Sequence, residues 1–157
     1  MIRYAVLLVL LMASPAVAAG APDARDSVKI QDCVKVSGQD TAKADVCVGQ
    51  VADPCLARSA TRSTADQNAC IDREYKVWDD ILNETFRLLR DKLDEAQKAK
   101  LREMQRAWIA SRDASCGFYG DFYQGTMASP MAAYCNTRET ARRALFLLGF
   151  LNNAESR

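Results

Sequence analysis

The sequence predicts an all-α protein, an antiparallel helical hairpin within a small bundle that is cross-linked by three disulfides. Three observations predict this class. Apolar residues recur at steps of three and four over two long stretches, which places them on one stripe of a helix. No glycine or proline interrupts residues 64–116. Six cysteines provide an even number for pairing.

Two long helices are expected, joined by a turn near residues 92–94. The first should begin at about Ala65, and the second should end near Tyr119 or Phe122. The first stripe consists of Tyr75, Trp78, Leu82, Phe86, Leu89 and Leu93. The second consists of Leu101, Met104, Trp108 and Ile109. Thr64 with Gln67, and Asp94 with Gln97, have the spacing of side-chain caps at the two helix starts.

Shorter elements are expected on either side of this pair. Residues 28–36 and 41–48 predict two short helices, which Gly38 and Gly49 end. The run Asp53-Pro54-Cys55 indicates a turn. Residues 127–150 predict a last helix, in which Pro130 is tolerated because it lies near the start.

The first 18 residues predict a secretory signal peptide. Arg3 gives a basic start, an apolar run follows, and Ala16-Val17-Ala18 is a small-x-small cleavage site. Cleavage after Ala18 leaves 139 of the 157 residues. The apolar run is too short for a permanent membrane span. No cysteine stands at the cleavage site, so we expect no lipid anchor.

The six cysteines indicate disulfides, because they follow a signal for export to an oxidising compartment. Fifteen connectivities are possible, and the spacing favours sequential pairing: Cys33 with Cys47, Cys55 with Cys70, and Cys116 with Cys135. Each bridge would contribute roughly 3 kcal/mol in the chain-entropy model. The alternative, a zinc site, is disfavoured because the chain has no C-x-x-C pair and no histidine. We expect neither a metal nor a cofactor.

The charges and the absence of histidine exclude several functional classes. The net charge is near zero, so the chain lacks the basic surface expected for binding nucleic acid or an anionic membrane. Without histidine, no Ser-His or Cys-His nucleophile can form. Carboxylates could still perform acid–base chemistry, from Glu74, Asp79, Asp80 and Asp113. Surface acids of helices are usually solvated or ion-paired, so we do not expect an enzyme.

The hairpin also predicts a polar network between its helices. If the turn is centred near Asp94, residues whose numbers sum to about 188 face each other. This register brings Asn83 to Gln105 as a buried polar rung, because buried polar groups need partners. It places Trp78 near Trp108 and Arg112. Arg112 would pair with Glu74 or Asp79, close to Asp113.

Two stretches are candidates for binding a partner. The loop expected at 120–130 carries Phe122, Tyr123 and Thr126, and an ordered aromatic loop offers contact area at low entropic cost. Its alternative role is core packing of the aromatic rings under the last helix. Arg138 and Arg142, together with Arg143, would form a solvated basic face that could steer an acidic partner.

The order of these residues resembles a known family. Gln105, Trp108, Arg112-Asp113 and Cys116 form the run Q-x-x-W-x-x-x-R-D-x-x-C. Other shared positions are Cys55, Thr64, Cys70, Glu74, Trp78-Asp79, Leu82-Asn83, Leu101, Gly125-Thr126, Cys135, Thr140 and Arg143. This pattern is similar to the LprI-type lysozyme inhibitor domain, an exported helical family, and covers residues 55–148. The family's namesake is lipid-anchored, and this chain lacks the cysteine for acylation.

The resemblance implies three segments and a function. Residues 1–18 would be the signal peptide, 19–54 a leader and a disulfide-linked helical hairpin, and 55–151 the LprI-like domain. The expected function is that of an exported, periplasmic binding protein that inhibits a lysozyme-like wall hydrolase. Such an inhibitor must block a carbohydrate cleft flanked by carboxylates. The alternative is a structural or envelope-stress adaptor that binds another exported protein.

Overall fold

The computed structural model describes residues 22–38, 43–58 and 63–156. In chain order these contain α1 (Ala24–Val36), the 3-10 helix η1 (Lys43–Cys47), α2 (Ala52–Leu56), α3 (Thr64–Asp91), α4 (Glu95–Tyr123) and α5 (Ala128–Glu155). The described residues hold no strand, and the all-α prediction is confirmed. None of their helices is long and apolar enough to cross a membrane. The predicted signal peptide, 1–18, lies outside them.

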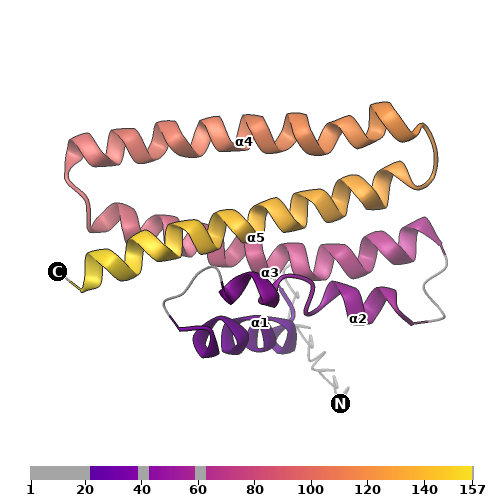
Figure 1. The fold of residues 1–157 in the computed structure, drawn as a ribbon, viewed down its shortest axis with the longest axis horizontal. Coiled ribbons are helices and arrows are strands. Elements are labelled where there is room, and N and C mark those ends of the chain that lie inside the picture. Colours follow the sequence, from indigo (N-terminus) through magenta and orange to yellow (C-terminus); the bar gives the residue numbers. More distant parts are fainter. Residues whose placement is uncertain (1–21, 39–42, 59–62, 157) are drawn as a thin grey trace, which may run out of the picture.

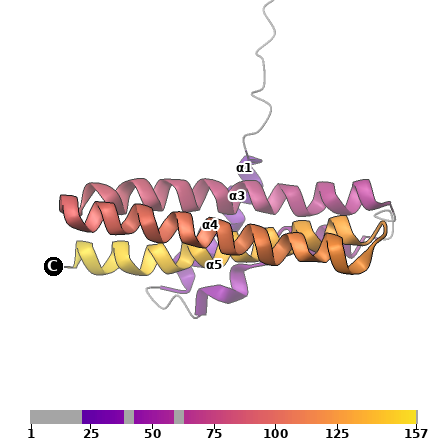
Figure 2. The same cartoon turned by 90° about the horizontal axis from the view of Figure 1, so that it is seen from above.

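The three long helices lie side by side along the long axis of the molecule, and each runs antiparallel to the one before it (Figures 1 and 2). Helix α5 lies between α3 and α4 in Figure 1, and it makes the main contacts with both of them. The two helices of the predicted hairpin make few direct contacts with each other. The last helix is therefore the centre of the bundle.

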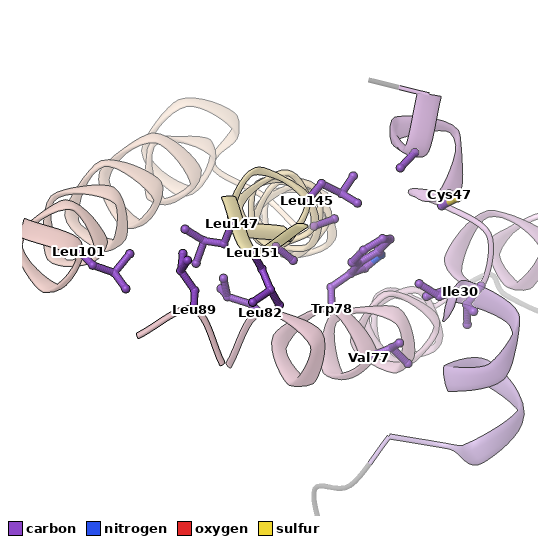
Figure 3. Packing of buried hydrophobic residues seen from close by; sticks show 14 residues of the cluster. Ile30, Cys47, Val77, Trp78, Leu82, Leu89, Leu101, Leu145, Leu147 and Leu151 are labelled. Carbon is purple, nitrogen blue, oxygen red and sulfur yellow. The ribbon is translucent and has the colours of Figure 1, made fainter. Parts of the chain in front are cut away.

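The composition of α5 explains its central place. Its buried positions include small residues on more than one side, namely Thr137, Thr140, Ala141 and Ala144. Small side chains let a neighbouring helix approach closely. Larger residues fill the remaining space towards the C-terminal end. Figure 3 shows Leu147 and Leu151 of α5 beside Leu82 and Leu89 of α3, with Leu101 of α4 on the far side.

The helix starts and ends follow local chemistry. Asp94 and Gln97 form the predicted capping box of α4, each side chain bonding the backbone of the other. The predicted cap at Thr64 is one residue off, because Ser63 Oγ accepts the Asp66 N–H and Thr64 is the first helical residue. Gln124 ends α4 in the left-handed region, with φ of 37°.

All three predicted disulfides are confirmed. Cys33–Cys47 links α1 to η1, Cys55–Cys70 links α2 to α3, and Cys116–Cys135 links α4 to α5. The prediction of a simple turn at Asp53-Pro54-Cys55 is wrong, because these residues belong to α2. Pro54 fits there because it lies in the first turn, where its missing N–H removes no helical hydrogen bond.

Glu74 attaches the N-terminal segments to the bundle. Its side chain is fully buried in α3. One carboxylate oxygen accepts the backbone N–H of Gly49 at 2.6 Å, and the other accepts those of Val51 and Ala52 at 2.8 and 2.7 Å. Trp78 Nε1 donates to the first oxygen at 3.0 Å. Four donors converge on one carboxylate, which holds the turn before α2 in place.

An ion pair makes a second attachment. Arg73 of α3 binds Asp26 of α1 through two hydrogen bonds, from Nε at 2.9 Å and from Nη2 at 2.8 Å. The Asp26 carboxylate raises the pKa of Arg73 above its ordinary value. Two-point binding fixes orientation as well as distance, so α1 is oriented on α3.

The predicted network between the long helices is wrong in its pairs. Asn83 is exposed and donates to Asp79 at 3.0 Å, whereas the Gln105 side chain accepts from Arg143 Nε of α5 at 2.9 Å. Arg112 pairs with its neighbour Asp113 and donates to Thr140 of α5, and does not reach Glu74 or Asp79. The physical reason is the position of α5, which lies between α3 and α4 and supplies partners for Gln105 and Arg112.

Candidate functional site

The end of the bundle where α4 turns into α5 exposes a group of aromatic side chains. Helix α4 continues to Tyr123, so the predicted loop 120–130 is reduced to residues 124–127. Phe118 is 61% exposed, Phe122 66% and Tyr123 48%. The alternative in which Phe122 and Tyr123 pack as core is therefore wrong. Thr126, the third predicted residue of this loop, is exposed as well.

The aromatic rings form one cluster. Phe118 and Phe122 lie 5.9 Å apart between ring centroids, Tyr119 stacks on Tyr123 at 5.9 Å, and Phe122 meets Tyr123 edge-on at 5.0 Å. Met127, which follows in the turn, is also exposed. We call this surface the aromatic tip; it consists of Phe118, Tyr119, Phe122, Tyr123 and Met127. Contiguous exposed apolar surface marks sites of interaction more often than scattered apolar residues do.

A disulfide and two hydrogen bonds fix the position of the aromatic tip on the bundle. The Cys116–Cys135 disulfide closes the chain around it over a sequence separation of 19. Thr64 Oγ1 at the start of α3 donates to the Thr126 carbonyl at 3.4 Å. Asn68 of α3 donates to Ser129 Oγ at 2.8 Å. The tip is thus anchored to all three long helices, which limits the entropy that binding would cost.

A groove begins beside the aromatic tip and contains both predicted arginines. Its volume is about 440 Å³. Its lining includes Tyr119 and Met127 of the tip, apolar residues of α2, α3 and α5, and Arg138 and Arg142. We call it the arginine groove. Arg142 makes ion pairs with Asp45 of η1 and Glu139, whereas Arg138 is exposed and makes no ion pair with any residue that the structure describes.

Arg143 does not belong to this basic face. It is buried, donates from Nε to Gln105, and its guanidinium carbon lies 5.5 Å from the Trp108 ring centroid and 5.3 Å from that of Phe146. Burial lowers the pKa of Arg143 below its ordinary value. Sequence alone missed this contact; the signal available was the position of Arg143 beside the buried stripe of α5.

The remaining predicted polar residues do not form a shared site. Glu74 is buried against the backbone before α2, Asp79 binds Asn83 on the surface, and Asp113 binds Arg112 on α4. Across residues 22–38, 43–58 and 63–156, no group of three or more histidine, cysteine, aspartate or glutamate side chains is placed to hold a metal ion. Glu74 connects α3 with the residues at the start of α2, whereas Asp79 and Asp113 each bind a residue of their own helix.

Tyr134, which lines the arginine groove, gives a titration that can be measured. Its hydroxyl donates to Asp53 at 2.9 Å, and burial together with this hydrogen bond raises its pKa to about 12. The fold therefore favours the neutral phenol. This contribution to stability is complete below the ordinary pKa of about 10 and is lost as the pH rises through about 12.

We expect the difference between the phenolate absorbance titrations of the wild type and of Tyr134→Phe to show one group with a midpoint near pH 12. A midpoint near the ordinary value of about 10 would show that Tyr134 is neither buried nor hydrogen-bonded to Asp53 in solution. Since phenylalanine cannot ionise, the variant should also lose stability less steeply above pH 10 or so.

Comparison with known proteins identifies relatives of this chain. Residues 55–147 match the model of the family described as "Lysozyme inhibitor LprI". An uncharacterized protein of Rhizobium meliloti (strain 1021) is 30% identical over 108 residues, which cover 60% of this chain and 78% of that protein. No solved structure matches the chain significantly. The matched segment contains α3, α4, the aromatic tip and most of α5.

Proposed function

The chain belongs to the LprI lysozyme inhibitor family, and we propose that it is an exported, periplasmic protein that binds and inhibits a lysozyme-type wall hydrolase. Three disulfides support export, because such bonds form and persist in oxidising compartments. The division of the chain into a leader with a hairpin at 19–54 and a domain at 55–151 is part of this proposal.

The observation that carries the proposal is the aromatic tip. Exposed phenylalanine side chains are costly in water, and their burial against a partner is favourable in proportion to the apolar area removed. Phe122 is the most exposed member of this cluster, and Tyr123, which meets its ring edge-on, is also exposed. Aromatic residues are also enriched among those that dominate binding energy at protein interfaces. We therefore assign the main contact with the hydrolase to this pair, and Thr126 to its edge.

The arginine groove supports the choice of partner. A lysozyme-type cleft contains two carboxylates that flank the scissile bond. Arg138 is exposed beside the groove and free of ion pairs within the described part of the chain, so it can meet an anionic group. Charge complementarity of this kind increases the association rate and orients the partner. Arg142 already makes ion pairs with Asp45 and Glu139, so we expect it to contribute less to binding the hydrolase than Arg138 does.

A turbidity assay of cell-wall lysis tests the proposal. The wild-type protein should slow lysis by a lysozyme in a saturable manner. The double variant Phe122→Ala and Tyr123→Ala should bind at least about 100-fold more weakly, because truncating a central aromatic residue typically costs about 2 kcal/mol. The matched control is Phe146→Ala with Phe150→Ala, which removes two exposed rings from α5, outside the aromatic tip, and should inhibit like the wild type.

The assay also separates the alternative function. If lysis is unchanged at a high molar excess of the wild-type protein, inhibition is ruled out. Periplasmic extract passed over the immobilised protein would then show whether another exported protein binds. Retention that depends on Phe122 and Tyr123 would favour the adaptor, with the same tip as its binding surface.

A further inference from the structure

A second groove, on a different part of the bundle, follows from the central position of α5. Helix α5 lies between α3 and α4 (Figure 1), and residues of all three helices line this groove. The groove has a volume of about 700 Å³ and lies within the size range of small-molecule sites. Ala69 and Ala133 leave it open, since neither side chain is large enough to fill it. We call it the polar groove.

Polar side chains from all three helices line it. Helix α3 provides Asn68, Asp72 and Tyr75, helix α4 provides Arg112 and Asp113, and helix α5 provides Ser129, Asn136 and Thr137. This density of amides, hydroxyls and charged groups is unusual for a contact between helices, which normally buries apolar stripes.

Several of these groups have unused hydrogen-bonding capacity. The Oδ1 atom of Asn68 is buried and has no partner among the described residues, while its Nδ2 donates to Ser129. If the Asn68 amide were flipped, Nδ2 would replace Oδ1 as the atom without a partner. One polar atom of this side chain therefore lacks a hydrogen bond in either orientation. Tyr75 is half-buried, and its hydroxyl makes no hydrogen bond within the described part of the chain. Asn136 uses only its Nδ2, on the Ala132 carbonyl. Buried polar groups normally have partners.

Both acidic side chains that line the groove already form ion pairs. Asp72 binds Lys76 at 2.7 Å, and Asp113 binds Arg112 at 2.8 Å. A charged ligand would therefore have to displace an existing ion pair, whereas a neutral ligand would not. Carboxylates, amides and hydroxyls that remain accessible can exchange hydrogen bonds with a molecule rich in hydroxyl groups.

From these observations we infer that the polar groove binds a neutral saccharide of one or two rings. Tyr75 and Asn136, which line the groove beside Asn68, would exchange hydrogen bonds with its hydroxyl or acetamido groups, and the Tyr75 ring would provide apolar surface for a sugar face. The groove and the aromatic tip are lined by different residues. The inference is therefore independent of the proposed inhibition, and either can fail alone.

Nuclear magnetic resonance titration of the full protein with N,N′-diacetylchitobiose, and separately with maltose, tests the inference. We expect saturable shifts at millimolar sugar in the Asn68 and Asn136 side-chain amides. Tyr75→Phe should weaken binding about three- to tenfold, the usual range for one lost hydrogen bond. The control is Ser111→Ala, which removes an exposed hydroxyl of α4 outside the groove and should bind like the wild type.

A second pair of variants tests the location by steric blocking. Ala69→Trp places a large ring in the groove from an exposed position of α3 and should abolish the shifts. Ala99→Trp makes the same change at an exposed position of α4 outside the groove and should leave them intact.

Each result has a defined meaning. Binding of diacetylchitobiose alone supports the inference with acetamido sugars as the ligands, and binding of maltose alone supports it with plain hexoses. The inference is overturned if neither sugar shifts the resonances of the groove residues. The same holds if the Ala69→Trp and Ala99→Trp variants bind the sugar equally well. It is also overturned if free lysine or acetate shifts these amides and the sugars do not, since that pattern requires a charged ligand.

Discussion

Replacing Glu74 by alanine should lower the free energy of unfolding by about 4 kcal/mol or more, because it leaves four N–H donors without an acceptor and each buried orphan costs about 1 to 3 kcal/mol. The donors are the backbone groups of Gly49, Val51 and Ala52 and the indole of Trp78. Glu74→Gln should cost about half as much, since its amide keeps one acceptor oxygen but directs a donor at other donors.

Urea denaturation of the oxidised protein measures this effect. Asp80→Ala is the control, because Asp80 is an exposed acid of the same helix and its loss should change stability by no more than about 0.5 kcal/mol. If Glu74→Ala and Asp80→Ala unfold at the same urea concentration, the carboxylate does not hold the N-terminal segments to α3.

Trp78→Ala should destabilise the protein by about 3 to 5 kcal/mol, the usual range for removing a fully buried large aromatic residue. Trp78 is fully buried and is the largest completely buried side chain that the structure describes. It contacts the core through its ring and Glu74 through its indole nitrogen. Trp78→Phe should cost less, since it keeps most of the packing and loses one hydrogen bond of about 1 kcal/mol.

The chain's other tryptophan serves as the comparison. Trp108 is only partly buried and contacts the guanidinium groups of Arg112 and Arg143. In the same urea series, Trp108→Ala should therefore lose less stability than Trp78→Ala. The reverse order would place the core of the bundle at the α4–α5 contact instead of the α3–α5 contact.

The local features of the fold could be predicted from sequence because they depend on neighbours in the chain. The capping box of Asp94 and Gln97 needs two residues three apart. The sequential disulfides have separations of 14, 15 and 19 residues, so short loops bring each pair together. The helical stripes depend only on the period of the α-helix. These are the features that the structure confirms.

The pairing of the long helices could not be predicted in the same way. An apolar stripe on α3 fits α4 or α5 equally well, and a short turn between α3 and α4 favours the wrong choice. That choice pairs Asn83 with Gln105, but α5 supplies the partner of Gln105. The small buried residues of α5, such as Ala141 and Ala144, were the available signal that this helix contacts two neighbours.

The candidate site was predicted in part. Phe122 and Tyr123 were chosen from composition, and the structure places them in one exposed cluster. The sequence predicts a helix end near Tyr119 or Phe122 and a loop at 120–130, because glycines at 120 and 125 favour a loop, but α4 continues to Tyr123. The burial of Arg143 is not predicted for a different reason. Its guanidinium contacts the rings of Trp108 and Phe146, and a search of the sequence for carboxylate partners does not detect a contact with aromatic rings.

In the proposed function, the aromatic tip is the surface that recognises a lysozyme-type hydrolase. Hydrogen exchange of the oxidised protein, measured with and without a saturating lysozyme, tests it most directly. We expect new protection in residues 116–130, with little change in α1 and in the turn between α3 and α4. Protection confined to those two regions, with residues 116–130 exchanging as in the free protein, would contradict the claim.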